Sequence, residues 1–273
     1  MTAGLATSIH SSACVAPSAQ LGRAVQVGPG AMIGPHVHVG DGCWIGPNVV
    51  LDGYLTLGAR NRVFPGACLG LEPQDLKYRG APTAVLIGDD NTFRECVTVN
   101  RATHEGEVTQ IGNGNLLMAY SHLAHNTLLG SGIVIANAVQ VAGHVVIEDH
   151  AVIGGVVGIH QFVRIGSMAM VGGMSRVVRD VPPFCIVEGN PCRVGGLNRV
   201  GLKRRGLAGL DSGRQVRDLE RIWRDFYRGD KTMIEALQQA EAQPLSPLAE
   251  QFVRFMAASL GSRRRGPMSR ARA

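Results

Sequence analysis

The sequence predicts a mainly β fold: a parallel β-helix of hexapeptide repeats followed by a small α-helical C-terminal domain. An aliphatic residue recurs at every sixth position from Ile9 to Leu69 and again from Ile111 to Val171, and the next residue is usually small. This period is neither that of an amphipathic helix nor that of an alternating strand. A hexapeptide period is typical of a parallel β-helix, whose coils must stack to bury their apolar stripes.

Each hexad is expected to supply one short strand and a tight turn. The aliphatic residue points into the coil, and the small residue beside it allows the chain to bend at the corner. The repeat is interrupted twice, and across both interruptions the register is kept as a multiple of six. Residues 70–86 and 100–110 are therefore expected to leave an intact solenoid as loops, and loops of this length in a compact repeat usually carry function.

We expect three segments along the chain. Residues 1–192 form the β-helix, residues 193–262 form the helical domain, and residues 263–273 form a basic, disordered tail. The helical domain is predicted from apolar residues at helical spacing, namely Leu219, Ile222, Trp223 and Phe226, and later Leu248, Phe252, Phe255 and Met256.

The charge of the chain is concentrated at its C-terminal end. The 273 residues carry a formal net charge of +6, and five arginines of the tail account for most of it. The remaining body lacks the interleaved aromatic and basic residues of a nucleic-acid surface, so we expect no nucleic-acid partner. The tail is either solvated or makes an electrostatic contact with an acidic partner or an anionic membrane.

The sequence shows no targeting signal and no transmembrane segment. The N-terminus lacks a basic stretch followed by an apolar core, and no apolar run approaches the roughly 20 residues that span a bilayer. The six cysteines show neither C-x-x-C pairs nor metal-ligand spacing, which is typical of a reducing compartment. We therefore expect a cytoplasmic protein.

A cluster of histidines is the strongest candidate for a functional site. Residues eighteen apart should stack on successive coils, roughly 4.8 Å apart. Three neighbouring columns then hold Ala124, Ala142 and His160; His125, Gly143 and Gln161; and Asn126, His144 and Phe162, with His122 on the first of these coils. Packing does not require three imidazoles beside small residues, so the cluster predicts function.

Two kinds of chemistry fit the cluster. A neutral imidazole, with an ordinary pKa of about 6.5, is suited to take a proton from a hydroxyl nucleophile. Three imidazoles could instead hold a zinc ion with an open fourth position. The neighbours Gln161 and Asn126 are hydrogen-bonding amides rather than carboxylates, which favours the first alternative and a site without metal.

Several segments occur in the order and spacing of one known family. They are Gln74-Asp75-Leu76-Lys77-Tyr78, Pro82-Thr83, Arg94-Glu95, Asn115-Leu116-Leu117-Met118, His122-x-x-His125, Ala142-Gly143-His144, His160-Gln161-Phe162, Asp180-Val181-Pro182-Pro183, Gly189-Asn190 and Gly201-Leu202-Lys203-Arg204-Arg205-Gly206. From about residue 8 to about residue 230, the chain closely resembles the UDP-N-acetylglucosamine O-acyltransferases, which perform the first committed step of lipid A synthesis in Gram-negative bacteria.

The resemblance implies a fold, an assembly and a reaction. The fold would be a left-handed β-helix, which is an exception to right-handed crossovers between parallel strands. The assembly would be a homotrimer with active sites between subunits. The enzyme would transfer an (R)-3-hydroxyacyl group from acyl carrier protein to the glucosamine 3-hydroxyl of UDP-N-acetylglucosamine, without a metal or diffusible cofactor.

The resemblance also implies roles for individual residues. His125 matches the family's general base, and the backbone N–H of Gly143 matches its oxyanion donor. Positions that contact the sugar nucleotide or the acyl donor are matched by Asp75, Lys77, His122, His144, His160 and Gln161. Positions near the uridine and the phosphates are matched by Asn198 and Arg204; a solvated helix start is the alternative interpretation of Arg204.

Three positions depart from the family. Asn126 stands where many members carry Asp; it can orient the imidazole but cannot stabilise its protonated form by charge. Val200 stands where the family often has Glu, and Ala81 replaces a common Glu of the loop. For the acyl chain, the small residues Gly172 and Gly173 favour a long donor over a short one.

Other functions remain as alternatives to this resemblance. The nearest are other hexapeptide acyltransferases, including the lipid A N-acyltransferase; that enzyme usually carries an N-terminal domain, whereas the hexads here begin at Ile9. A non-catalytic trimeric β-helix scaffold would leave the histidine cluster without a role. A γ-type carbonic anhydrase would use the imidazoles to bind metal.

Overall fold

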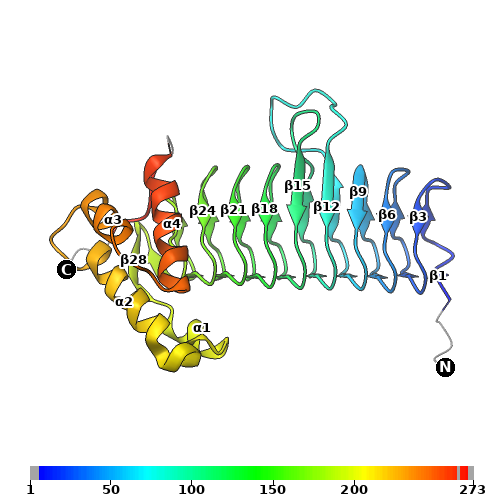
Figure 1. Ribbon diagram of the computed structural model, residues 1–273. Helices are drawn as coiled ribbons and strands as arrows, with labels where there is room; N and C mark the ends of the chain where they lie inside the picture. The colour runs from blue at the N-terminus through cyan, green and yellow to red at the C-terminus, as the bar shows by residue number, and fades with distance from the viewer. Residues whose placement is uncertain (1–5, 263–264, 270–273) are drawn as a thin grey trace.

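The computed structural model describes residues 6–262 and 265–269 and shows a long solenoid of short strands with helices at its C-terminal end (Figure 1). Three sheets run along the solenoid, and successive strands of the chain pass from one sheet to the next. The aliphatic positions point inward; Ile45, Leu123 and Val141, for example, have no exposed surface. The predicted fold class, a parallel β-helix followed by helices, is confirmed.

Sheet A has eleven strands and continues into the C-terminal region. Its last two strands form the antiparallel pair β27 and β28, whereas all earlier pairs are parallel. In spatial order the strands are β1 (Ser8–Ile9), β4 (Gln26–Val27), β7 (Trp44–Ile45), β10 (Arg62–Val63), β13 (Thr92–Phe93), β16 (Leu116–Leu117), β19 (Val134–Ile135), β22 (Val152–Ile153), β25 (Met170–Val171), β27 (Cys185–Gly189) and β28 (Cys192–Leu197).

Sheets B and C complete the triangular coil. Sheet B contains β2 (Cys14–Val15), β5 (Met32–Ile33), β8 (Val50–Leu51), β11 (Cys68–Leu71), β14 (Thr98–Asn100), β17 (His122–Leu123), β20 (Gln140–Val141), β23 (Gly158–Ile159) and β26 (Arg176–Val177). Sheet C contains β3 (Gln20–Leu21), β6 (His38–Val39), β9 (Tyr54–Leu57), β12 (Ala84–Ile87), β15 (Val108–Ile111), β18 (Leu128–Leu129), β21 (Val146–Ile147) and β24 (Arg164–Ile165).

Each aliphatic position is followed by a small residue for a steric reason. A Cβ on Gly40 would lie 2.6 Å from the carbonyl carbon of Gly58 in the next coil. The left-handed backbone of the corner falls two positions later, often on residues other than glycine, such as Asn126 (φ 60°) and His144 (φ 57°). Small residues are therefore needed because coils approach closely, which corrects the prediction that they allow the bend.

Two loops interrupt the coils at the same corner. Residues 72–83 connect β11 to β12, and residues 101–107 connect β14 to β15; both pass from sheet B to sheet C. They project together beyond the coils near β12 and β15 (Figure 1). The next turn at this corner, between β17 and β18, contains His125. The solenoid therefore brings both loops to the start of the histidine cluster.

Helices cover the C-terminal end of the solenoid. They are α1 (Arg199–Arg204), the 3-10 helix η1 (Leu207–Gly213), α2 (Arg214–Tyr227), α3 (Met233–Glu241) and α4 (Pro247–Gly261). The eight apolar residues that predicted the helical domain are all buried. Strand β28 extends to Leu197, five positions beyond the expected boundary at residue 192. None of the helices among the described residues is long and apolar enough to cross a membrane.

The C-terminal tail is partly ordered. Residues 265–269 run beside Asp180: its N–H donates to Gly266 (3.1 Å), and its carbonyl accepts from Met268 (2.8 Å). The Tyr227 hydroxyl donates to the Met268 carbonyl at 3.1 Å, and Met268 is buried. The expectation of a disordered tail is therefore wrong for residues 265–269, because an apolar side chain and backbone hydrogen bonds fix them. Residues 263–264 and 270–273 lie outside the described residues.

Candidate active site

His125 lies at the corner after β17, and the predicted columns are confirmed around it. Strand β17 pairs with β20, and β20 pairs with β23, at an offset of eighteen residues. The His144 N–H donates to the His125 carbonyl at 3.0 Å, and the Phe162 N–H donates to that of Gly143 at 3.2 Å. The rings of His125 and His144 meet edge to face, with centroids 5.1 Å apart.

The His125 imidazole is held at one nitrogen and open at the other. Its Nδ1 lies 2.9 Å from Oδ1 of Asn126, and its Nε2 lies 3.8 Å from Oδ2 of Asp75. The residue is only 7% exposed. The Nε2 atom therefore has no close hydrogen-bond partner among the described residues, and its residue lines a cavity from which a substrate could reach it.

Asp75 is positioned by its own loop and by the second loop. Its Oδ1 accepts from the Lys77 N–H at 3.0 Å, and its Oδ2 accepts from the Thr103 hydroxyl at 3.3 Å. The Lys77 N–H, together with the nearby His125 and the Thr103 hydroxyl, lowers the pKa of Asp75 despite partial desolvation. The structure thus shows a backbone role for Lys77, whose side chain is exposed.

The two flanking histidines are kept neutral by their surroundings. Burial first, and then the neighbouring His125, lowers the pKa of His122, whose Nδ1 lies 2.7 Å from the Thr98 hydroxyl. Burial and His125 also lower the pKa of His144, against the opposing effects of Glu107 and Asp75. Protonation of His122 and of His144 is therefore disfavoured in the folded chain.

Gly143 is required by the position of the His125 ring. A Cβ at Gly143 would lie 2.4 Å from Cε1 and 2.5 Å from Nε2 of that ring. Among the described residues, no protein acceptor faces the Gly143 N–H. The glycine therefore lets the imidazole lie against the main chain, and its own N–H is left without a protein acceptor.

A cavity of about 560 Å³ opens beside these residues. It is lined by His122, His125 and His160, by Gln74 and Arg176, and by the small or aliphatic surface of sheet B. His160 is exposed, and its Nδ1 lies 3.0 Å from the Gln161 carbonyl. Gln161 lines a smaller adjoining cavity of about 230 Å³ together with His160. The predicted histidines thus share one surface, with His144 behind His125.

Asn198 and Arg204 lie elsewhere in this chain. They line a separate cavity of about 660 Å³ on sheet A, together with Val200, Met168 and Met170. The Asn198 side chain caps α1 through Gly201 and donates to the Met168 carbonyl, both at 2.9 Å. Arg204 is exposed, as the alternative interpretation expected, but it lies in the last turn of α1 and not at a helix start.

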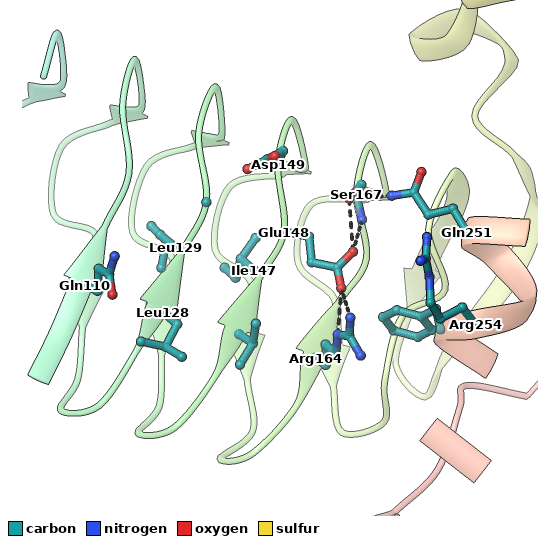
Figure 2. Close-up of a pocket in the computed structure, with 13 residues that line it drawn as sticks. Gln110, Leu128, Leu129, Ile147, Glu148, Asp149, Arg164, Ser167, Gln251 and Arg254 are labelled. Atoms are coloured by element: carbon teal, nitrogen blue, oxygen red, sulfur yellow. Dashed lines mark hydrogen bonds and ion pairs between the residues drawn. The ribbon is translucent and has the colours of Figure 1, made fainter. Parts of the chain in front are cut away.

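A third cavity, of about 530 Å³, lies between sheet C and α4 (Figure 2). Glu148 accepts hydrogen bonds from Arg164 and Ser167, and Gln251 of α4 donates to the Ser167 hydroxyl at 3.0 Å. Arg164 also lies over the Phe255 ring, 4.7 Å from its centroid. The polar groups mainly satisfy one another, so this cavity is a join between helix and solenoid that contains none of the predicted site residues.

Metal ligation has no geometric support in the part of the chain that the structure describes. There, no group of three or more His, Cys, Asp or Glu side chains is arranged to hold a metal ion. His160 stands apart from the paired rings of His125 and His144. It occupies the column next to that of His125 and lies one coil beyond the coil of His144.

Comparisons with known proteins identify the family. Residues 180–268 match the family model described as domain 2 of UDP-N-acetylglucosamine O-acyltransferase, and residues 18–53 match six bacterial transferase hexapeptide repeats. A protein of Verminephrobacter eiseniae named acyl-(acyl-carrier-protein)–UDP-N-acetylglucosamine O-acyltransferase is 45% identical over 262 residues, which cover 95% of this chain and 98% of the relative. The chain belongs to the UDP-N-acetylglucosamine O-acyltransferase family.

Further members of the UDP-N-acetylglucosamine O-acyltransferase family agree in sequence and in fold. The Rippkaea orientalis relative of the same name is 58% identical over 220 residues, covering 80% of this chain and 78% of the relative. The solved UDP-N-acetylglucosamine acyltransferase of Francisella novicida aligns with a TM-score of 0.90 at 33% identity, covering 97% of this chain and 94% of that chain. The likeness therefore extends over the solenoid and the helical region.

Sequence reasoning missed several polar residues at this O-acyltransferase site. Glu107 and Thr103 hydrogen-bond to the Asn126 side chain, and Thr98 to that of His122. Neither Glu107 nor Thr103 gave a signal in the repeat, because both lie in the loop of residues 101–107, which makes the offset from β14 to β17 twenty-four residues instead of eighteen.

Proposed function

We propose that this O-acyltransferase moves an (R)-3-hydroxyacyl group from acyl carrier protein to the glucosamine 3-hydroxyl of UDP-N-acetylglucosamine, the first step of lipid A biosynthesis. The observation that carries the proposal is the His125 ring, with Nδ1 bound to Asn126 and Nε2 open beside Asp75. A nitrogen so placed can accept a proton from a sugar hydroxyl. The partners are thus acyl carrier protein and the sugar nucleotide, in the cytoplasm.

The reaction proceeds by transfer of one proton through His125. Its Nε2 takes the proton of the 3-hydroxyl while the hydroxyl oxygen attacks the thioester carbonyl carbon, and the new C–O bond forms. The C–S bond then breaks, and the departing thiolate recovers the proton from Nε2. Asp75 stabilises the imidazolium between these steps, and no metal or diffusible cofactor is needed.

The Gly143 N–H is the proposed donor to the developing oxyanion. Its residue lies against the His125 ring and, among the described residues, the N–H has no protein acceptor of its own. A preorganised backbone donor stabilises the tetrahedral intermediate because it needs no reorientation during the reaction. His122, His144, His160 and Gln161 remain proposed contacts of the sugar nucleotide or the acyl donor.

The second cavity lies apart from His125 within one chain. Asn198 and Arg204 belong to sheet A and α1, whereas His125 lies at the corner of sheets B and C. We therefore propose a homotrimer in which the His125 cavity of one subunit faces the Arg204 cavity of the next. The exposed guanidinium of Arg204 is suited to the pyrophosphate of the nucleotide.

An acyl-transfer assay tests the function. The unmodified chain, His125→Ala and the matched control His38→Ala, which removes an exposed histidine from sheet C, are given 3-hydroxyacyl carrier proteins of different lengths and UDP-N-acetylglucosamine. We expect His125→Ala to lose at least about 100-fold in kcat, and His38→Ala to remain active. Full activity of His125→Ala would contradict its role as the base, and no transfer by the unmodified protein would contradict the function.

A further inference from the structure

The Asn126 side chain has a different hydrogen-bond partner on each side of its amide. Its Oδ1 accepts from the Thr103 N–H at 3.2 Å and lies 2.9 Å from Nδ1 of His125. Its Nδ2 donates to Oε2 of Glu107 at 2.8 Å. Both outer partners belong to the 101–107 loop, so this loop reaches His125 through Asn126.

The two partners in the loop fix which way the amide points. A backbone N–H can only donate, so Thr103 requires an oxygen opposite it. An ionised carboxylate can only accept, so Glu107 requires the NH₂ group. Although partial desolvation opposes it, hydrogen bonds from Asn126 and His104 lower the pKa of Glu107, which keeps this carboxylate ionised. A flipped amide would lose both hydrogen bonds.

The fixed amide determines the state of His125. Because Asn126 presents oxygen to the ring, Nδ1 must carry a hydrogen, and the lone pair of the neutral imidazole lies on Nε2. The loop holds Glu107 in turn: its Oε2 accepts from the His104 N–H at 3.1 Å, and its own N–H donates to the His104 carbonyl at 3.0 Å.

We propose that Glu107 is a positioning residue, which holds the Asn126 amide so that His125 keeps its proton on Nδ1 and its lone pair on Nε2. The inference rests on the proposed function of His125 as the base. It gives the 101–107 loop a role in catalysis. It also provides a carboxylate that is linked to the ring through the Asn126 side chain.

Variants of the two residues separate orientation from charge. Glu107→Gln keeps an acceptor for Asn126 and is expected to retain kcat within about 3-fold, because its amide oxygen can replace Oε2. Glu107→Ala removes the acceptor, and we expect kcat to fall about 10-fold or more with an unchanged KM, since a loosely held base costs rate rather than binding. Glu105→Ala, an exposed change in the same loop, is the matched control.

A charge exchange gives a second test. Asn126→Asp alone sets a carboxylate against Glu107, so we expect a loss of kcat. The double variant Asn126→Asp with Glu107→Gln exchanges the amide and the carboxylate and is expected to recover most of this loss. The tautomer is read independently from the ring ¹⁵N shifts of His125, with Nδ1 protonated in the unmodified chain and a mixture in Glu107→Ala.

The outcomes distinguish the inference from the function on which it rests. Wild-type kcat and a single His125 tautomer in Glu107→Ala, with His125→Ala inactive, would overturn the role of Glu107 alone. Activity in His125→Ala would overturn the function itself. No recovery in the double variant, with both single variants impaired and folded, would also overturn the inference, because it requires the two side chains to act as a pair.

Discussion

At the scale of single residues, the site depends on what surrounds one imidazole. His125 is bounded by Asn126 at Nδ1, by Asp75 near Nε2 and by the bare main chain of Gly143 beneath the ring. The neighbouring imidazoles have lowered pKa values because of burial and of His125 itself. Each of these contacts leads to a measurable consequence.

Replacing Gly143 with Ala should impair the reaction more than the fold. The new Cβ would overlap the His125 ring, at 2.4 to 2.5 Å from two of its atoms. The ring is the free end of a side chain and can move away, so the fold survives while the base is displaced. We expect kcat to fall about 100-fold or more.

The control for this change is Gly196→Ala, where a Cβ would meet nothing within 4 Å. Both variants should show thermal unfolding close to that of the unmodified protein. A Gly143→Ala enzyme with normal kcat would show that the ring position that Gly143 permits does not matter.

The free energy of unfolding should fall when the pH drops below about 6.5, the ordinary pKa of histidine. The pKa values of His122 and His144 are lowered in the folded chain, so the unfolded chain binds more protons. Their contribution is complete above the ordinary histidine pKa of about 6.5 and is lost as the pH falls towards the lowered values. The shifted carboxylates titrate lower, below about pH 4.5.

This pH dependence is checked with urea unfolding at pH 7.5 and pH 5.5. A variant with His122→Gln and His144→Gln should lose less stability between these values than the unmodified chain, and His38→Gln should behave like the unmodified chain. Identical losses in all three proteins would contradict the assignment to His122 and His144.

At the scale of elements, the repeat predicted the strands well because each hexad places one side chain in the core. The phase survives both loops, as the pairing of Ile87 with Ile111 and of Phe93 with Leu117 shows. The columns through His125 followed from the same period. Contacts made by the two loops could not be predicted, because no period relates Asp75 or Thr103 to a position on a coil.

A buried ladder of asparagines also escaped the sequence analysis. Oδ1 of Asn61 accepts from the backbone N–H and from Nδ2 of Asn91. Oδ1 of Asn91 accepts from the backbone N–H of Asn115, and Oδ1 of Asn115 accepts from the backbone N–H of Ile133. All three asparagines are at most 2% exposed. Their column was hidden because the loops make its sequence spacing unequal.

Breaking the ladder at its centre should destabilise the solenoid. Asn91→Ala would leave the Asn115 N–H and the Gly112 carbonyl without their present partners inside the protein. We expect a loss of roughly 2 to 4 kcal/mol in the free energy of unfolding, since each buried unpaired group costs about 1 to 3 kcal/mol.

Urea unfolding at a fixed protein concentration measures this loss. The control is Asn137→Ala, an exposed asparagine on the same solenoid, which should change stability by less than about 0.5 kcal/mol. Equal stability of the two variants would show that water replaces the ladder at no cost.

At the scale of the whole molecule, the residues of the proposed site are divided between two cavities of one chain. The histidine cavity and the Arg204 cavity open on different faces of the triangular coil. A closed ring of three identical subunits would bring each cavity against its complement. In such a ring, two variants that are inactive alone, each with one cavity impaired, would restore activity when they assemble together.

Mixing His125→Ala with Arg204→Ala subunits should therefore recover activity. After unfolding and refolding together in equal amounts, about a quarter of the sites would combine an intact His125 from one subunit with an intact Arg204 from the next. The assay compares the mixture with each variant refolded alone. Activity that stays at the level of the separate variants would place both residues in sites within one chain.

The length of the transferred acyl chain is also expected to depend on the assembled groove. Gly173 is exposed and has no side chain, whereas the position of a Cβ on Gly172 is already taken by Glu188, whose Cβ would lie 2.8 Å away. We expect transfer of a long 3-hydroxyacyl chain in preference to a short one. Mass analysis of the products from a set of donors checks this, and transfer of ten-carbon chains alone would contradict it.

The two loops leave and re-enter the solenoid at one corner. The inward-pointing positions on either side stay in register, although the pairing of β11 with β14 is irregular between Leu69 and Leu71, where the loops begin. Insertions or deletions there can change what surrounds His125 without shifting any coil below. The coils can equally accept aliphatic exchanges without touching the loops. Selection can thus act on substrate preference and on thermal robustness through separate sets of mutations, a modularity that also suits this chain to loop grafting.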